Sequence, residues 1–212
     1  SLDTKFKKAE VVPISTKVED EFTKRFMNHL WDTMLYGGLG GWKIFERYMH
    51  HLLCKKPATE FQCRKCVGMT DDAYKNLVPI TLGGCVRIKF TIHIIEAAKK
   101  TPNTVFYSTD QYLKLIDFVY RDYKNHFHAF QATIGKTHKA TPKYIKELQK
   151  KVGGGKNLSL YYLVPAETFH GFVTHPVNPG IKDEGITCDI YHVKVPKPND
   201  ESTVTAKEEQ EI

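Results

Sequence analysis

The stretch Leu115-Ile-Asp-Phe-Val-Tyr-Arg-Asp-Tyr-Lys-Asn-His-Phe-His-Ala-Phe-Gln-Ala-Thr-Ile-Gly-Lys-Thr-His138 decides how the rest of the chain is interpreted. Its two halves, Leu115 to Tyr120 and His126 to Thr133, are rich in β-branched and aromatic residues and flank a polar turn. This pattern predicts a β-hairpin. Because side chains alternate between the faces of a strand, a turn near the middle places odd-numbered residues opposite each other. We therefore expect Asp117 and Gln131 to lie side by side, as a candidate site.

These two residues and two others would suit a metal-dependent phosphodiesterase, which needs hard oxygen ligands for Mg²⁺. Asp117 offers a carboxylate, and Gln131 offers an amide carbonyl. Glu46, on an upstream helix, could add a second carboxylate, and Lys136 could stabilise developing negative charge. A structural interpretation stays open, in which Asp117 is a capped carboxylate and Gln131 a satisfied strand amide.

The charge of the chain points to a polyanionic partner. The 212 residues include 31 basic and 24 acidic side chains, a net charge of +7. The segment from Pro196 to Ile212 holds five acids and two lysines, a contribution of −3, so the part before it carries +10. A basic body favours nucleic acid, although many proteins without that function are equally basic. The 41% hydrophobic content excludes disorder throughout the chain.

The five cysteines are expected to be reduced thiols of an intracellular protein, because their number is odd and their spacing irregular. Cys63 and Cys66 have the spacing of half a zinc site. No second pair of Cys or His completes four ligands, so no structural zinc is expected. No apolar run approaches the roughly 20 residues of a membrane span, and no membrane association is expected.

Two helices are predicted upstream of the hairpin. A capping box from Thr16 to Glu19 starts the first. Its apolar stripe is predicted to be Phe22, Phe26, Leu30 and Met34. The second should run from Trp42 to Leu53, and it carries Glu46 and His50 four residues apart. That pair is either an exposed helix pair or part of the site.

A further helix is predicted after the hairpin, starting at Thr141-Pro142 and ending near Val152, before a run of glycines. Its outer side and the turn before it carry Lys139, Lys143, Lys146 and Lys150. A row of lysines is usually just solvated, but this one begins beside the candidate site. It is also placed to follow a phosphate backbone.

The order of elements predicts an α/β sandwich with a mixed sheet. The other predicted strands are Glu60 to Cys66, Cys85 to Ile95, Asn103 to Tyr107, Leu158 to Val164 and Cys188 to Val195. Leu158 to Val164 is continuously apolar, as expected of a central strand, and the helix before it predicts a parallel crossover from the hairpin. We expect one domain over residues 16–195, a poorly ordered lead over 1–15 and a disordered acidic tail over 196–212.

Several motifs resemble the nuclease-like domain of crinkler effectors and retrotransposon hot spot proteins. They are Ala129-Phe-Gln-Ala-Thr-Ile-Gly-Lys-Thr-His138, Leu115-Ile-Asp-Phe118, Leu160-Tyr-Tyr-Leu-Val-Pro-Ala-Glu-Thr-Phe169 and Gly41-Trp-Lys-Ile-Phe-Glu-Arg-Tyr-Met-His50. That family is a divergent branch of the PD-(D/E)XK, restriction-endonuclease-like fold. The resemblance implies a core of helix, three strands, helix and strand, with an added N-terminal helix and C-terminal strand. It also implies Mg²⁺- or Mn²⁺-dependent cleavage of nucleic acid.

In this resemblance Asp117 falls at the metal-binding aspartate and Gln131 at the acidic position of the Glu-x-Lys strand. Thr133 stands where the lysine is usual, and Lys136 is a candidate replacement. Glu46 matches the helix glutamate. Gln131 brings no negative charge and Thr133 no ammonium group, so the pattern departs from the family at two positions.

Three functions follow as alternatives. The first is a metal-dependent nuclease that acts on DNA, as an effector in a nucleus. The second is a degenerate nuclease fold that binds nucleic acid or a chromatin protein without cutting, for which Gln131 and Thr133 argue. The third is an interaction domain whose basic surface meets an acidic protein.

Overall fold

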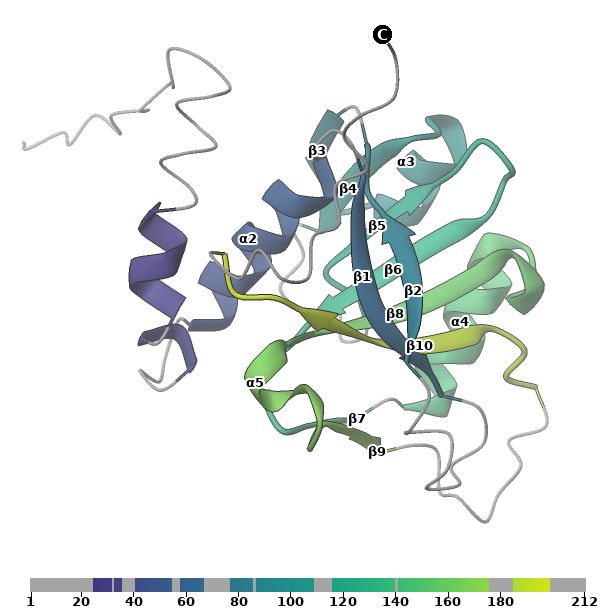
Figure 1. Ribbon diagram of the computed structural model, residues 1–212. Coiled ribbons are helices and arrows are strands. Elements are labelled where there is room, and N and C mark those ends of the chain that lie inside the picture. Colours follow the sequence, from purple (N-terminus) through teal and green to yellow (C-terminus); the bar gives the residue numbers. More distant parts are fainter. Residues whose placement is uncertain are drawn as a thin grey trace, which may run out of the picture.

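The computed structural model describes residues 25–31, 33–35, 41–54, 58–66, 77–85, 87–108, 116–139, 141–175 and 185–198. The predicted capping box, the lead, most of the acidic tail and the glycine-rich turn before α2 lie outside these ranges. Within them the protein is an α/β structure built on one mixed sheet of eight strands, in the order β2-β1-β10-β8-β6-β5-β4-β3 (Figure 1). The predicted fold class is confirmed at this level.

The sheet is joined at its centre by the predicted crossover. β4 (Thr104–Ser108), β5 (Phe118–Arg121) and β6 (Phe127–Ala132) form an antiparallel meander. α4 (Pro142–Val152) then connects β6 to β8 (Leu158–Pro165), which pairs with β6 in parallel. All eight residues of β8 are buried, as predicted for a central strand.

The outer strands enclose this centre. β10 (Asp189–Val195) runs parallel to β8, and β1 (Thr59–Lys65) pairs antiparallel with β10. β2 (Val78–Leu82) forms one edge beside β1, and β3 (Arg87–Thr91) forms the other beside β4. A separate two-stranded ladder joins β7 (Thr137–Lys139) to β9 (Val173–His175).

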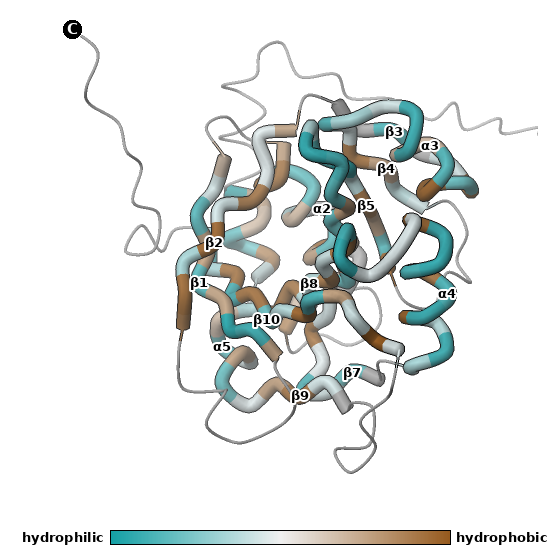
Figure 2. The backbone as a smooth tube through the Cα atoms, turned by 90° about the vertical axis from the view of Figure 1, so that its right-hand side faces the viewer, coloured by the Kyte–Doolittle hydropathy of each residue, from teal (hydrophilic) through white to brown (hydrophobic). Residues whose placement is uncertain are grey.

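Helices cover both faces of the sheet, so the core has two halves (Figures 1 and 2). On one face α2 (Gly41–Cys54) and the helical residues 25–31 and 33–35 pack with Phe118, Phe130 and Tyr161. On the other face α3 (Ile94–Lys100), α4 and α5 (Ala166–Phe169) pack with Val119, Ala129 and Leu160.

The ends of α4 match the sequence signals. Pro142 occupies the first turn after Thr141, although the Thr141 hydroxyl makes no capping hydrogen bond. Gly153 ends the helix in the left-handed region with φ of 88°, and its N–H donates to the carbonyls of Gln149 and Lys150. A side chain is strained at this φ, which explains glycine at the stop.

One predicted strand is partly wrong, and another strand was not predicted. The strand predicted over Cys85 to Ile95 ends at Thr91, and Ile94 begins α3. α3 buries Ile94, Ile95 and Ala98, and lysines in its last turn complement the helix dipole. The strand β2 was not predicted; its Pro79 is tolerated because β2 is an edge strand.

The predicted stripe of the first helix is confirmed at Met34, which is buried, and wrong at Phe26, which is 48% exposed. Phe22 lies outside the described residues. Met27 and Trp31, which were not predicted, are buried. The Trp31 indole explains this choice, because it packs edge-on against Phe45 and donates a 2.7 Å hydrogen bond to Glu167 Oε1. A bulky indole with a partner for its N–H outweighs a phenyl ring in setting which side of the helix is buried.

Candidate functional site

Asp117 lies at the bend before β5, where the meander begins its second strand. Val119 pairs with Ala129, which places Asp117 opposite Gln131 in the same register. The backbone fixes the residue on both sides, since Asp117 N–H donates to Phe130 O and Asp117 O accepts from Ser108 N–H. The aspartate is therefore held by both neighbouring strands.

The side-chain carboxylate of Asp117 accepts a hydrogen bond from the backbone of β6, as a carbonyl of a neighbouring strand would. Its Oδ2 accepts from Ala132 N–H at 2.7 Å and from the Gln131 amide, Nε2, at 2.9 Å. The prediction that Asp117 and Gln131 are neighbours is confirmed. Both hydrogen bonds use Oδ2, and within the described residues Oδ1 makes none.

Burial raises the pKa of the Asp117 carboxyl to about 7, against the two hydrogen bonds that favour its ionised form. The negative charge of Glu46 raises this pKa further. A carboxyl group that stays protonated up to near-neutral pH is unusual, and groups with such shifted pKa values concentrate at functional sites.

Glu46 reaches this region from α2. Its charge and that of Asp117 both act to raise the pKa of Tyr107, whose burial is the main cause of its high value. The His50 Nε2 lies 3.6 Å from Glu46 Oε1, and the His50 ring meets Phe118 edge-on. The structure therefore brings Glu46 into the electrostatic neighbourhood of Asp117, as the site hypothesis requires, with His50 beside it.

Among the described residues, Thr133 and Lys136 make no hydrogen bond or ion pair with Asp117. Thr133 is buried, and its hydroxyl accepts from Gly135 N–H. Lys136 is exposed in the turn to β7, where its carbonyl accepts from Val173 N–H. No hydrogen bond or ion pair among the described residues joins Lys136 to Asp117, so its role as a replacement lysine stays a prediction.

The lysines of α4 lie on its outer side. Lys143, Lys146 and Lys150 are exposed, while Ile145, Leu148 and Val152 are buried under the helix. Lys139 belongs to β7, and the position of its side chain is not described. The hydrophilic outer side of α4 is visible in Figure 2. These lysines remain candidates for phosphate contacts.

The donor set suits a hard cation. Within the described ranges no cluster of three or more His, Cys, Asp and Glu side chains is arranged to hold a metal. Mg²⁺ is commonly bound through only one or two carboxylates, with waters and substrate phosphates completing the shell. Asp117 and Glu46 supply that number, and Asp117 Oδ1 makes no hydrogen bond to a described group. The residues therefore fit Mg²⁺ or Mn²⁺.

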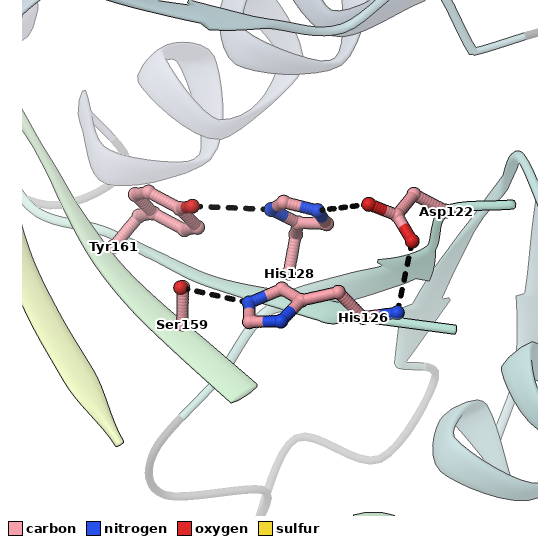
Figure 3. A network of polar contacts seen from close by, with 5 residues as sticks. All are labelled: Asp122, His126, His128, Ser159 and Tyr161. Atoms are coloured by element: carbon pink, nitrogen blue, oxygen red, sulfur yellow. Dashed lines mark hydrogen bonds and ion pairs between the residues drawn. The ribbon is translucent and has the colours of Figure 1, made fainter. Parts of the chain in front are cut away.

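A second polar network, which the sequence did not reveal, lies at the opposite end of the β5–β6 hairpin (Figure 3). His128 contacts Asp122 Oδ2 through Nε2 at 3.3 Å and the Tyr161 hydroxyl through Nδ1 at 3.1 Å. His126 contacts the Ser159 hydroxyl through Nε2 at 2.9 Å. Burial lowers the pKa of His128 to about 4. A neutral His128 that donates to Asp122 and accepts from Tyr161 satisfies all three groups.

A third network lies inside the opposite face. Arg64 is 3% exposed and donates to His192 Nδ1 and to the carbonyls of Phe169 and Phe172. Thr174 meets the other nitrogen of His192 at 2.8 Å. These bonds fasten α5 and β9 to the sheet, which is a structural role. Polar residues in strands carry no pattern that predicts such partners from the sequence.

The two cysteines with the spacing of half a zinc site, Cys63 and Cys66, lie on different faces of the sheet. Cys63 is buried on the α2 face, whereas Cys66 hydrogen-bonds Thr174 on the other face. Burial raises the pKa of both thiols, to about 11 for Cys63 and about 12 for Cys66. Neither thiol is activated as a nucleophile.

The fold and site define a mixed α/β protein with the hydrogen-bonded carboxyl of Asp117 at one end of its central meander. No protein-family model matches the chain, and neither curated proteins nor solved structures yield a match. In the described part of the chain no helix is long and apolar enough to cross a membrane.

Proposed function

We propose that this protein is a metal-dependent phosphodiesterase that cleaves DNA, with a restriction-endonuclease-like fold of the crinkler and retrotransposon hot spot type. One observation carries the proposal. The Asp117 carboxylate, at the start of the second meander strand, is held through Oδ2 by the Gln131 amide and Ala132 N–H, and the charge of Glu46 on α2 acts on it. The order of α2, the β4–β5–β6 meander, α4 and β8 supports the same fold proposal. An effector role in a nucleus, with a nuclear protein partner, belongs to this proposal.

The proposed chemistry divides among residues of three elements. Asp117 and Glu46 would hold a divalent cation, which would supply polarisation of the phosphate and a lower pKa for a bound water. The Asp117 carboxylate is held by β6, so its orientation is fixed before substrate arrives. The α4 lysines bind the phosphate backbone, and Lys136 stabilises negative charge from the turn after β6.

The test is cleavage of supercoiled plasmid by the wild type and by Asp117→Asn, with Mg²⁺, Mn²⁺ or EDTA. We expect cleavage that EDTA abolishes, and a loss of about 100-fold or more in the variant, since a bound cation contributes several kcal/mol to such a transition state. Asp189→Asn is the matched control, because Asp189 lies in the same sheet and pairs with Lys65 instead. Cleavage by Asp117→Asn at the wild-type rate would refute the proposal.

A second candidate is a nucleic-acid or chromatin-protein binding module without catalysis. Gln131 and Thr133 favour it, because the site lacks the second strand acid and the lysine that the family pattern requires. It predicts salt-sensitive DNA binding in EDTA with no cleavage under any cation. A wild type that cleaves only with a cation excludes this candidate.

A further inference from the structure

We infer that Gln131 positions Asp117 and is not itself a ligand of the cation. In this arrangement Gln131 and the β6 backbone hold Oδ2, and Oδ1 of Asp117 serves the cation together with Glu46. The inference rests on the cation site of the proposed function. It departs from the expectation that the Gln131 carbonyl oxygen replaces the missing acid of the strand.

The surroundings of the Gln131 amide determine which of its ends faces Asp117. Its Nε2 lies 2.9 Å from Asp117 Oδ2 and 3.4 Å from Ala132 O. Both neighbours are oxygens, and an ionised carboxylate and a backbone carbonyl only accept hydrogen bonds. A flipped amide would place Oε1 against these two oxygens. The network therefore assigns the nitrogen to this side, which is the way such orientations are established.

The same geometry separates the two oxygens of Asp117. Oδ2 already has two donors, from Gln131 and from Ala132 N–H. A cation at Oδ2 would meet the partial positive charge of both N–H groups, whereas Oδ1 has no such donor among the described residues. Gln131 could coordinate only by turning its amide and giving up its hydrogen bond. Binding through Oδ1 keeps both hydrogen bonds of Oδ2.

This arrangement also explains how the site functions without the strand acid. A carboxylate at position 131 would lie directly beside that of Asp117 across the hairpin and would repel it. A neutral donor instead stabilises the ionised form of Asp117 and fixes its direction. Outer partners of this kind orient metal ligands and typically contribute about 10- to 100-fold to metal affinity.

The test is an NMR titration of the full chain with Mg²⁺, following the side-chain amide signals of Gln131. These signals are assigned by their loss in Gln131→Met, and a folded spectrum is required of each variant. We expect Mg²⁺ to shift signals of Asp117 and Glu46 while the Gln131 amide keeps the shift and slow exchange of a hydrogen-bonded group. Movement of the amide to the signal of a solvent-exposed glutamine at saturating Mg²⁺ would overturn the inference. No Mg²⁺-dependent shift at the site would also overturn it.

Direct binding of Mn²⁺, measured from the loss of the free-ion electron paramagnetic resonance signal, supplies a second readout. We expect Gln131→Met to bind about 10- to 100-fold more weakly but with the same stoichiometry, and Asp117→Asn to lose the site. Gln62→Met, a matched change in β1, should bind as the wild type does. Loss of the site in Gln131→Met, with the wild-type stoichiometry in Glu46→Gln, would overturn the inference.

These outcomes are distinguishable from failure of the proposed function. Mg²⁺ binding with the Gln131 amide retained, but without DNA cleavage, supports this inference and refutes the nuclease. Cation-dependent cleavage with the Gln131 amide displaced supports the nuclease and refutes this inference.

Discussion

Glu46 and Asp117 are separated by 71 positions, yet the charge of the first raises the pKa of the second. The two carboxylates are brought together because α2 packs on the face of the sheet that holds Tyr107 and Phe118. The charge of Glu46 disfavours ionisation of the Asp117 carboxyl. The first two predictions concern this effect on Asp117.

Replacing Asp117 by Asn should stabilise the fold at high pH. The folded pKa of about 7 lies above the usual 3.8, so Asp117 contributes stability at low pH that is lost as pH rises through 7. The difference between these two pKa values corresponds to a loss of on the order of 4 kcal/mol in the free energy of unfolding at pH 8. Urea unfolding at pH 5 and pH 8 should show the variant gaining on the wild type as pH rises. A difference that is the same at both pH values would contradict this.

Removing the charge of Glu46 should lower the pKa of Asp117 toward its ordinary range. The change Glu46→Gln keeps the shape of the side chain while removing one of the causes of the raised pKa. A carboxyl carbon NMR titration would report it. Glu96→Gln is the control, because Glu96 pairs with Lys99 on α3 and is not among the causes of the Asp117 shift. An unchanged midpoint in Glu46→Gln would mean that the two carboxylates are not coupled.

The His128 network should make the protein acid-sensitive. The pKa of His128 in the fold, about 4, lies below the usual 6.5, so the unfolded chain takes up its proton first. Stability is therefore lost as pH falls from 6.5 toward 4, by on the order of 3 kcal/mol from this residue.

The measurement for His128 is the free energy of unfolding at pH 7 and pH 4.5. His128→Gln should lose less stability between these values than the wild type does. Burial also lowers the pKa of His192, to about 3. Because His192 is present in both proteins, its contribution cancels in the comparison. Equal losses in the two proteins would exclude His128 as a source of acid sensitivity.

Neutralising the α4 lysines should reduce the salt dependence of DNA binding. For the triple change of Lys143, Lys146 and Lys150 to Gln, the slope of log K against log salt should fall by about 3, since each phosphate contact contributes about 0.9. Exposed lysines on other elements, Lys65, Lys99 and Lys124, provide a triple control of equal charge. An equal fall of this slope in both triple variants would mean that net charge alone, and not the position of the α4 lysines, determines the salt dependence.

Trp31 should anchor the N-terminal helical segment. Its side chain is fully buried, packs against Phe45 and Tyr48 and donates to Glu167. Trp31→Ala should cost about 3 to 5 kcal/mol in the free energy of unfolding. Phe26→Ala, a change on the exposed side of the same segment, is the control and should cost far less. Similar losses in both variants would argue against the anchor.

The sequence predicted those features that local rules determine. The hairpin register, the start and stop of α4 and the buried β8 depend on alternation, proline, glycine and apolar runs, and the structure has them. The neighbourhood of Asp117 and Gln131 followed from that register.

Other features depend on partners that are distant in the chain. Ile94 and Ile95 suit a strand or a buried helix equally, and α3 was decided by its packing on β4 and β5. Trp31 was chosen over Phe26 because Glu167 is within reach of its indole. The partners of Arg64, which are His192, Phe169 and Phe172, lie more than 100 positions away from it in the sequence. No local pattern encodes such partners.

The pairing of β1 with β10 has a consequence for synthesis on the ribosome. In the described part of the chain β1 and β2 join the other strands only through β10, which is the last strand to be made. The β1–β2 pair can therefore join the sheet only after β10 has emerged. Contacts of such long sequence separation fold slowly and leave unpaired strand edges exposed meanwhile. Nascent chains in which Asp189 has not yet been added should consequently depend on chaperones until β10 is inserted into the sheet.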